Sequence, residues 1–203
     1  TIKIAIYIDG DLYSFDGLAD RDGKPVFYTS HFFSTGIMHS VNESHDLFYY
    51  SLRDIPEDLK DAGLKTLKAF NARETFFHLE YFRTKKDKKI VALEVNMRPP
   101  GALTTDMFNF ANDIDIYQEW ANVVVNNRFD SKYDRKYHCC YIGRKYVNNY
   151  KHSRQEIFEK YGKYIVADTV IPDVFSAAIG NYAYIARHQD LNKILEIAKF
   201  ILS

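Results

Sequence analysis

The stretch "VALEVNMRPPGALTTDM", residues 91–107, combines a short apolar strand pattern with polar side chains at every second position. These are Glu94, Asn96 and Arg98, and the strand pattern then breaks at a Pro-Pro-Gly sequence. Side chains at alternate positions of a strand lie on one face of its sheet. A carboxylate, an amide and a guanidinium are therefore expected on one face at the end of a strand, which points to a chemical role.

A second strand pattern, "TFFHLEYFRT" at residues 75–84, precedes this stretch and is joined to it by the polar turn "KKDKK". If the turn is centred on Asp87, three pairs of residues face each other on one side of the hairpin: Glu80 with Glu94, His78 with Asn96, and Phe82 with Ala92. The opposite side is expected to be core and carries four apolar residues: Leu79, Tyr81, Leu93 and Val95.

Two carboxylates directly across a strand pair repel each other, so Glu80 and Glu94 favour a cation between them. Asn96 adds a neutral oxygen ligand, and hard oxygen donors with room for water and phosphate are what Mg²⁺ prefers. Arg98 suits a phosphate or carboxylate through a forked, charge-assisted contact. The alternative from spacing alone is a solvated hairpin face with paired surface charges, and the spacing leaves both open.

The segments "FFHLEYF" and "VALEVNMRPPG" resemble the metal-binding hairpin of the ATP-grasp superfamily. The branch they resemble holds biotin carboxylases, the large chain of carbamoyl-phosphate synthase and carboxylate-amine ligases. The resemblance implies that Glu80, Glu94 and Asn96 bind two Mg²⁺ ions that hold ATP, with Glu94 bridging both ions and Mn²⁺ as an alternative metal. It also implies that Arg98 is catalytic and faces the transferred phosphoryl group or the acyl phosphate.

The resemblance extends to "YIDGDLYSFDGLADRDGKPVFY" and "FSAAIGNYAYIARHQD" and implies an α+β fold, a mainly antiparallel sheet flanked by helices, of the C-terminal part of an ATP-grasp enzyme. Residues 1–126 are expected to form the subdomain with the metal-binding hairpin, and residues 127–203 an α/β extension packed on it. The N-terminal domain and the nucleotide lid are expected to be absent from this chain, which would leave it inactive alone.

The chain departs from the family pattern at two places. Relatives carry acidic residues where Ala5 and Ile6 stand, so nucleotide contacts at that strand are not predicted. A second Gly commonly follows the Pro-Pro-Gly, and Ala102 replaces it here. We expect the loop to tolerate that small change.

Periodicity predicts three antiparallel strands within residues 2–33, with turns at Asp9-Gly10 and Asp22-Gly23. Pro56 and an acidic first turn predict an amphipathic helix that ends near Phe70. The remaining expected helices are 105–111, 115–125, 153–161 and 189–202, and the remaining expected strands are 137–141, 164–171 and 182–187.

The chain has 203 residues, 46% of them hydrophobic, and 27 basic side chains balance 27 acidic ones. That balance argues against nucleic-acid and membrane partners. The basic stretch "RKYHCCYIGRKY" could line a single-strand nucleic-acid groove, but an amphipathic strand explains it better. Adjacent Cys139 and Cys140 fit neither a disulfide framework nor a zinc site, and they indicate a cytoplasmic protein in which they are structural.

Other polar residues have two interpretations each. His78 could contact phosphate or a carboxylate, or it could pack against neighbouring Phe side chains. Asp106 and Asn109 could shape an acceptor pocket, or Asp106 could stabilise the start of a helix. A metal role is not expected for the remaining histidines, which lack ligand spacing: His31, His39, His45, His138, His152 and His188.

The function predicted from this resemblance is an ATP-dependent ligase of the carboxylate-amine or carboxylate-thiol type that acts through an acyl phosphate. Its partners would be a small carboxylate, or bicarbonate, and an amine or thiol, and the protein could form a homodimer. One alternative is a non-catalytic nucleotide-sensing or scaffold module derived from the same fold, which the Ala5-Ile6 departure favours. A two-metal phosphoesterase is the other.

Overall fold

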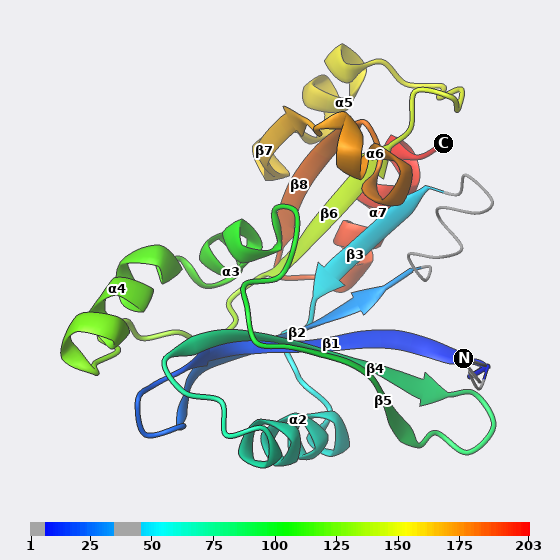
Figure 1. Ribbon diagram of the computed structural model, residues 1–203. Coiled ribbons are helices and arrows are strands. Elements are labelled where there is room, and N and C mark those ends of the chain that lie inside the picture. Colours follow the sequence, from blue (N-terminus) through cyan, green and yellow to red (C-terminus); the bar gives the residue numbers. More distant parts are fainter. Residues whose placement is uncertain (1–6, 35–45) are drawn as a thin grey trace.

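The computed structural model describes residues 7–34 and 46–203, which form one antiparallel sheet flanked by helices (Figure 1). The strand order is β5-β4-β1-β2-β3-β6-β8-β7. The strands are β1 (Gly10–Ala19), β2 (Pro25–Phe33), β3 (Leu47–Ser51), β4 (Thr75–Thr84), β5 (Ile90–Asn96), β6 (His138–Arg144), β7 (Ile165–Val170) and β8 (Tyr182–His188). The helices are α2 (Glu57–Ala69), α3 (Thr104–Asn112), α4 (Ile116–Asn126), α5 (Arg154–Tyr161), α6 (Asp173–Ile179) and α7 (Leu191–Ile201), with a short 3-10 turn, η1 (Gly162–Tyr164).

The two faces of the sheet are covered by different helices. One face carries α2 over β1 and β4, and α5 with α7 over β6 and β8. The other face carries α3 and α4, whose Met107, Phe108 and Val123 are buried against the strands. Figure 1 shows that the sheet twists strongly, so that β1 and β4 run in a clearly different direction from β6 and β8. This twist separates the β4–β5 hairpin from the β6–β8 end of the sheet.

Helix α2 illustrates how closely a sequence pattern can match local structure. Pro56 stands at its N-cap, with Glu57 and Asp58 in the first turn. Gly63 is buried, and an added Cβ would lie 2.3 Å from the ring of Phe15. Because α2 packs this closely on β1, it holds β1 in position beside the β4–β5 hairpin.

Most predicted elements are confirmed within a few residues of their expected bounds, as is the turn at Asp22-Gly23 between β1 and β2. The predicted turn at Asp9-Gly10 is wrong, because Gly10 begins β1. The strand expected ahead of it includes residues 1–6, which lie outside the described residues, and residues 7–9 form no strand. Strand β3 and helix α6 were not predicted. Helix α6 has only seven residues, too few for a helical period to be recognised in the sequence.

The two cysteines are structural, as predicted. Cys139 and Cys140 are free, fully buried thiols in β6. Burial raises the pKa of both thiols, so neither is a thiolate at neutral pH. The basic stretch around them is a central strand of the sheet, paired with β3 and β8. The segment after residue 126 thus shares the sheet with the earlier strands, and a division between 126 and 127 stays a prediction.

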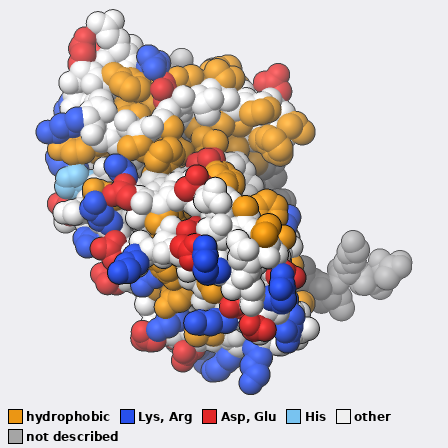
Figure 2. All heavy atoms as spheres, turned by 90° about the vertical axis from the view of Figure 1, so that its left-hand side faces the viewer, with side chains coloured by type: hydrophobic (Ala, Val, Ile, Leu, Met, Phe, Trp, Pro, Cys, Tyr) orange, Lys and Arg blue, Asp and Glu red, His pale blue; other side chains and the backbone are white. Residues whose placement is uncertain are grey.

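Apolar side chains reach the surface on one side of the molecule. Figure 2 shows hydrophobic side chains gathered over the upper part of the face that includes α4, with acidic and basic side chains over the lower part. The most exposed large apolar residues of β7, α6 and α4 are Val125, Val170, Val174 and Phe175. Exposed apolar surface of this kind is typical of regions that other protein segments cover. None of the helices formed by the described residues is long and apolar enough to span a membrane.

Candidate active site

The β4–β5 hairpin brings together the polar side chains that the sequence analysis selected. Glu80 pairs with Glu94, and His78 pairs with Asn96, as predicted. The predicted pairing of Phe82 is wrong by one position, because a bulge follows Glu80 and places Tyr81 opposite Ala92. The predicted register is therefore correct for His78 and Glu80 and their partners, and it shifts only after Glu80.

The bulge also corrects the expected core. Leu79 and Tyr81 are buried, and Val95 packs against them. Leu93, expected in the same layer, is 51% exposed. It is the extra residue of the bulge, without a partner on β4, and β5 is an edge strand. A bulge residue is released from the alternation of the ladder, which explains its exposure.

Two rows of polar side chains continue from this hairpin across the sheet into β1 and β2. Strand pairing places the members of each row side by side: Asn96, His78, Asp16 and Thr29 in one, and Glu94, Glu80, Ser14 and His31 in the other. Of these eight residues, Ser14, Asp16, Thr29, His31 and Glu80 are buried. Polar residues buried on a sheet face require hydrogen-bond partners, and the rows supply most of them.

His78 links the two rows through both ring nitrogens. Its Nδ1 lies 2.5 Å from Oδ1 of Asp16, and its Nε2 lies 3.2 Å from Oε1 of Glu80. Burial alone would lower the pKa of His78, but the charge of Asp16 and hydrogen bonds to both carboxylates raise it to about 10. Since each nitrogen faces a carboxylate, both carry a proton, and His78 is a cation at neutral pH.

Asp16 is the centre of the buried network. It accepts hydrogen bonds from Ser14 Oγ, from Nδ1 of His31 at 2.8 Å and from Nδ1 of His78. Burial would raise the pKa of Asp16, but the charge of His78 and the two histidine hydrogen bonds hold it well below its usual range. Nε2 of His31 is buried without a hydrogen-bond partner among the described residues, and its ring stacks on Phe108 of α3.

Glu80, Glu94 and Asn96 remain the residues of this face that could hold a metal. Oε1 of Glu80 faces His78, whereas Glu94 is exposed and makes no hydrogen bond within the described part of the chain. The amide nitrogen of Asn96 is buried and likewise has no partner there. The amide group is therefore not held by an internal hydrogen bond, and its oxygen is available to a ligand.

These donors fit Mg²⁺ held jointly with a phosphate ligand. Residues 7–34 and 46–203 contain no cluster of three or more His, Cys, Asp or Glu side chains that could hold a metal ion. Mg²⁺ is commonly bound by one or two carboxylates, with substrate phosphates and water completing its octahedron. Glu80 and Glu94 supply two carboxylates and Asn96 an amide, which matches that pattern.

Arg98 follows β5 in an exposed loop. Its Nη1 donates to the carbonyl oxygen of Pro99 at 2.9 Å, so the guanidinium folds back on its own loop. Glu80, Glu94 and Asn96 share one face of the sheet, whereas Arg98 lies in the loop between β5 and α3.

Asp106 and Asn109 of α3 have internal partners. Asp106 lies in the first turn of α3 and accepts a hydrogen bond from the Tyr117 hydroxyl at 3.0 Å. Oδ1 of Asn109 accepts from the backbone N–H of Ile116 at 2.7 Å. The position of Asp106 agrees with its structural interpretation, and the contacts of both residues join α3 to α4.

Ala102, the departure from the family pattern, stands in a left-handed backbone conformation with φ of 54°. This conformation costs a residue with a Cβ about 1–2 kcal/mol. Glycine avoids that cost but loses about 0.5–1 kcal/mol of chain entropy. We expect Ala102→Gly to raise the free energy of unfolding by about 0.5–1 kcal/mol, measured by urea denaturation.

The matched control is Ala121→Gly, an exposed helical position in α4. Glycine in a helix interior is less favourable than alanine by about 1 kcal/mol, so this variant should lose stability. A loss in both variants would contradict the strain assigned to Ala102.

The sequence analysis missed Asp16, His31 and Ser14. A signal was present, because Ser14 and Asp16 alternate within the otherwise apolar run "LYSFDGLA", as Thr29 and His31 do in "FYTSHFF". Period-two polar positions in a strand indicate a shared face. The sequence did not indicate that this face continues the β4–β5 hairpin, because β1 pairs with β4, and the paired residues lie about sixty positions apart.

No family model matches the sequence, and no curated protein matches it. Solved structures do match. An L-amino acid ligase from Bacillus licheniformis is similar with a TM-score of 0.71 and 11% identity over 96% of this chain and 53% of that one. A phosphoribosylglycinamide synthetase from Anaerococcus prevotii is similar with a TM-score of 0.64 and 13% identity over 96% of this chain and 52% of that one.

The biotin carboxylase domain of a Hydrogenobacter thermophilus 2-oxoglutarate carboxylase, solved with MgADP and bicarbonate, has a TM-score of 0.54 and 14% identity over 90% of this chain and 43% of that one. The chain thus spans about half the length of the structures it matches. At these identities the likeness shows the fold. It is the fold that the hairpin motif implied, the ATP-grasp fold.

Proposed function

We propose that this chain supplies the magnesium- and phosphate-binding part of an ATP-dependent ligase of the carboxylate-amine or carboxylate-thiol type. The observation that carries the proposal is the pairing of Glu80 with Glu94 across β4 and β5, with Asn96 on the same face. Repelling carboxylates held in register favour a cation between them. Proteins with the same fold include an L-amino acid ligase, a phosphoribosylglycinamide synthetase and a biotin carboxylase domain, the last solved with MgADP.

The residues of the site would divide the work of binding and orientation. Glu80, Glu94 and Asn96 would hold Mg²⁺, of which we expect two ions, and Mg²⁺ would neutralise phosphate charge during transfer to a carboxylate. His78 and Asp16 hold Glu80 in place through the contacts described above. Arg98 would leave the Pro99 carbonyl to contact a phosphate or acyl-phosphate oxygen with its planar fork.

We further propose that a complete active site needs protein outside these 203 residues. The structures that match are about twice as long, and the apolar side chains exposed on α6 and β7 suit a surface covered by another segment. The isolated chain would then fold but not turn over substrate. We also place the protein in the cytoplasm, since its two cysteines are unpaired thiols in the core.

The test is Glu94→Gln, which keeps the side-chain shape and removes the charge. In the isolated chain, Mg²⁺ with ADP should raise the melting temperature, and the variant should lose most of that increase. In an active ligase that contains this chain, ATP-dependent ADP release should fall about 100-fold or more, on the order of 3 kcal/mol. Carboxylates paired with amines or thiols would serve as substrates.

The matched control is Glu57→Gln, the same chemical change at an exposed position of α2, which should alter neither readout. Full turnover by Glu94→Gln would overturn the metal assignment. Mg²⁺-dependent nucleotide binding without turnover in any protein containing this chain would instead favour the sensing or scaffold module.

A further inference from the structure

Glu80 differs from Glu94 because one of its two carboxylate oxygens is already occupied. Oε1 of Glu80 lies 3.2 Å from Nε2 of His78, and the Glu80 side chain is only 10% exposed. Its other oxygen, Oε2, makes no hydrogen bond or ion pair within residues 7–34 and 46–203, and it is accessible to solvent. Glu94 is exposed and has neither kind of contact in that part of the chain. A cation would therefore meet one free oxygen on Glu80 and two on Glu94.

The imidazole of His78 is held at its other end as well. Nδ1 of His78 lies 2.5 Å from Oδ1 of Asp16, whose carboxylate is fully buried. Asp16 also accepts hydrogen bonds from Ser14 and His31, which are buried too. Turning the ring of His78 away from Glu80 would break a buried hydrogen bond that water cannot replace. The Nε2–H donor is therefore a fixed part of the site.

The number of free carboxylate oxygens affects Mg²⁺ and Ca²⁺ differently. Mg²⁺ demands near-ideal octahedral geometry and is usually bound through one or two carboxylates, with water and phosphate oxygens as its other ligands. Ca²⁺ is larger, accepts more oxygen ligands in flexible geometry and often takes both oxygens of one carboxylate. Selectivity between the two ions depends on the size of the site and on the number and flexibility of its ligands. A donor that occupies one carboxylate oxygen therefore weakens Ca²⁺ binding more than Mg²⁺ binding.

We propose that His78 makes this site selective for Mg²⁺ over Ca²⁺, because its Nε2–H holds Oε1 of Glu80 and leaves that carboxylate a single oxygen for a metal. The inference rests on the proposed function, in which Glu80 is a metal ligand. His78 is a positioning residue, since it contacts the ligand and not the metal. Any charge on His78 repels both divalent ions alike and so cancels from the ratio of their affinities.

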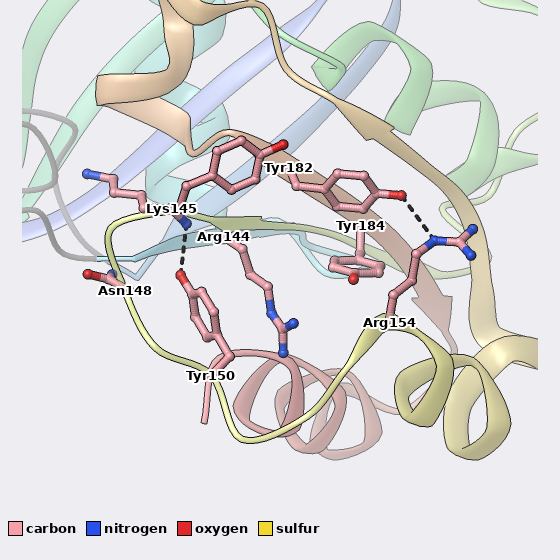
Figure 3. Close-up of a pocket in the computed structure, with 8 residues that line it drawn as sticks. Arg144, Lys145, Asn148, Tyr150, Arg154, Tyr182 and Tyr184 are labelled. Carbon is pink, nitrogen blue, oxygen red and sulfur yellow. Dashed lines mark hydrogen bonds between the residues drawn. The ribbon is translucent and has the colours of Figure 1, made fainter.

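A cavity of about 290 Å³ at the β6–β8 end of the sheet does not compete for these ions (Figure 3). Arginine, lysine and tyrosine side chains dominate its wall, and no Asp or Glu of the described residues lines it. Figure 3 shows two of its internal hydrogen bonds, from the backbone N–H of Lys145 to the Tyr150 hydroxyl and from Arg154 to the Tyr182 hydroxyl. Its basic wall repels divalent cations, so a response to Mg²⁺ or Ca²⁺ reports on another part of the molecule.

Two substitutions of His78 test the role of its hydrogen bond. His78→Gln keeps an N–H donor on a side chain of similar reach, whereas His78→Leu removes the donor. The wild-type chain and each variant are melted with ADP at a fixed concentration and with increasing Mg²⁺ or increasing Ca²⁺. The rise in melting temperature gives an apparent Kd for each ion. The readout is the ratio of the Kd for Ca²⁺ to the Kd for Mg²⁺, which a loss of overall stability does not change.

The wild-type chain should bind Mg²⁺ about tenfold more tightly than Ca²⁺, or more. His78→Leu should lower that ratio about tenfold, because groups that orient a metal ligand typically change metal affinity about 10- to 100-fold. His78→Gln should keep the ratio within about threefold of the wild-type value. The matched control is His188→Leu at the end of β8, far along the strand order from the hairpin, and it should leave the ratio unchanged.

The outcomes separate this inference from the proposed function. No rise in melting temperature with either ion would overturn the metal site and the inference with it. Equal affinities of the wild-type chain for Mg²⁺ and Ca²⁺ would overturn the inference alone, and this comparison requires no variant. An unchanged ratio in His78→Leu, shown by circular dichroism to be folded, would also overturn it, as would the loss of selectivity in folded His78→Gln.

Discussion

Replacing Asp16 with Asn is expected to lower the free energy of unfolding by about 3–5 kcal/mol near pH 7. The side-chain shape is kept, but His78 loses the carboxylate 2.5 Å from its Nδ1, and His31 loses an acceptor at 2.8 Å. Asp16 is fully buried, so water cannot replace it. The variant leaves the His78 cation with Glu80 as its one carboxylate among the contacts described, and the lost attraction to Asp16 in a medium of low dielectric constant is the source of the cost.

Urea denaturation of the wild-type chain and the variant measures this difference. The control is Asp58→Asn, because Asp58 makes a two-pronged ion pair with Arg83 at 2.7 Å but is half exposed. Exposed pairs contribute about 1 kcal/mol at most. Equal losses in Asp16→Asn and Asp58→Asn would show that the buried network does not stabilise the fold beyond a surface pair.

The second large effect is a loss of stability in alkali that depends on His78. Its pKa is raised from 6.5 to about 10 in the folded protein. A raised folded-state pKa means that the protonated form stabilises the fold fully below the unfolded-state value and that this contribution disappears as pH rises through about 10. A shift of that size corresponds to about 5 kcal/mol at most.

His78→Gln should remove this dependence, since glutamine does not titrate. The measurement is the free energy of unfolding of the wild-type chain and the variant between pH 6 and about 10.5, with the difference between the two curves as the readout. The variant should be less stable at pH 6, and the curves should converge toward the alkaline end. Parallel curves would show that His78 is not held as a cation. On the acid side, the pKa of Asp16 is lowered in the folded protein. The stability that its carboxylate contributes is therefore lost as pH falls below the usual pKa range of aspartate.

The sequence was sufficient for the local parts of the candidate site. A turn of known centre and a period of two set which residues of β4 and β5 face each other, so the pairing of Glu80 with Glu94 and of His78 with Asn96 could be derived in advance. The predicted register is wrong beyond Glu80. A bulge depends on packing at the edge of the sheet, and the alternation of apolar and polar residues does not reveal it. The exposure of Leu93 is the result.

Helix α2 was predictable for a similar reason. Pro56, an acidic first turn and apolar residues at helical spacing are signals carried by neighbouring residues. Helix α6 also follows a proline, Pro172, and has Asp173 in its first turn, but its seven residues are too few to show a helical period. Strand β3 is five residues long and pairs with β2, the preceding strand, and with β6, which is distant in sequence.

The sequence by itself therefore determined the hairpin and its facing carboxylates, because these depend on residues close together along the chain, and the resemblance of that hairpin to a known family implied the fold. Only the tertiary structure decided that Asp16 of β1 would lie between His31 and His78, and that His78 would be a cation held against Glu80. The contact with His31 crosses the β1–β2 pair, and the contact with His78 joins β1 to β4, which lie on either side of β2, β3 and α2 in the sequence. The charge of a buried group is set by what surrounds it in space and not by its neighbours in sequence.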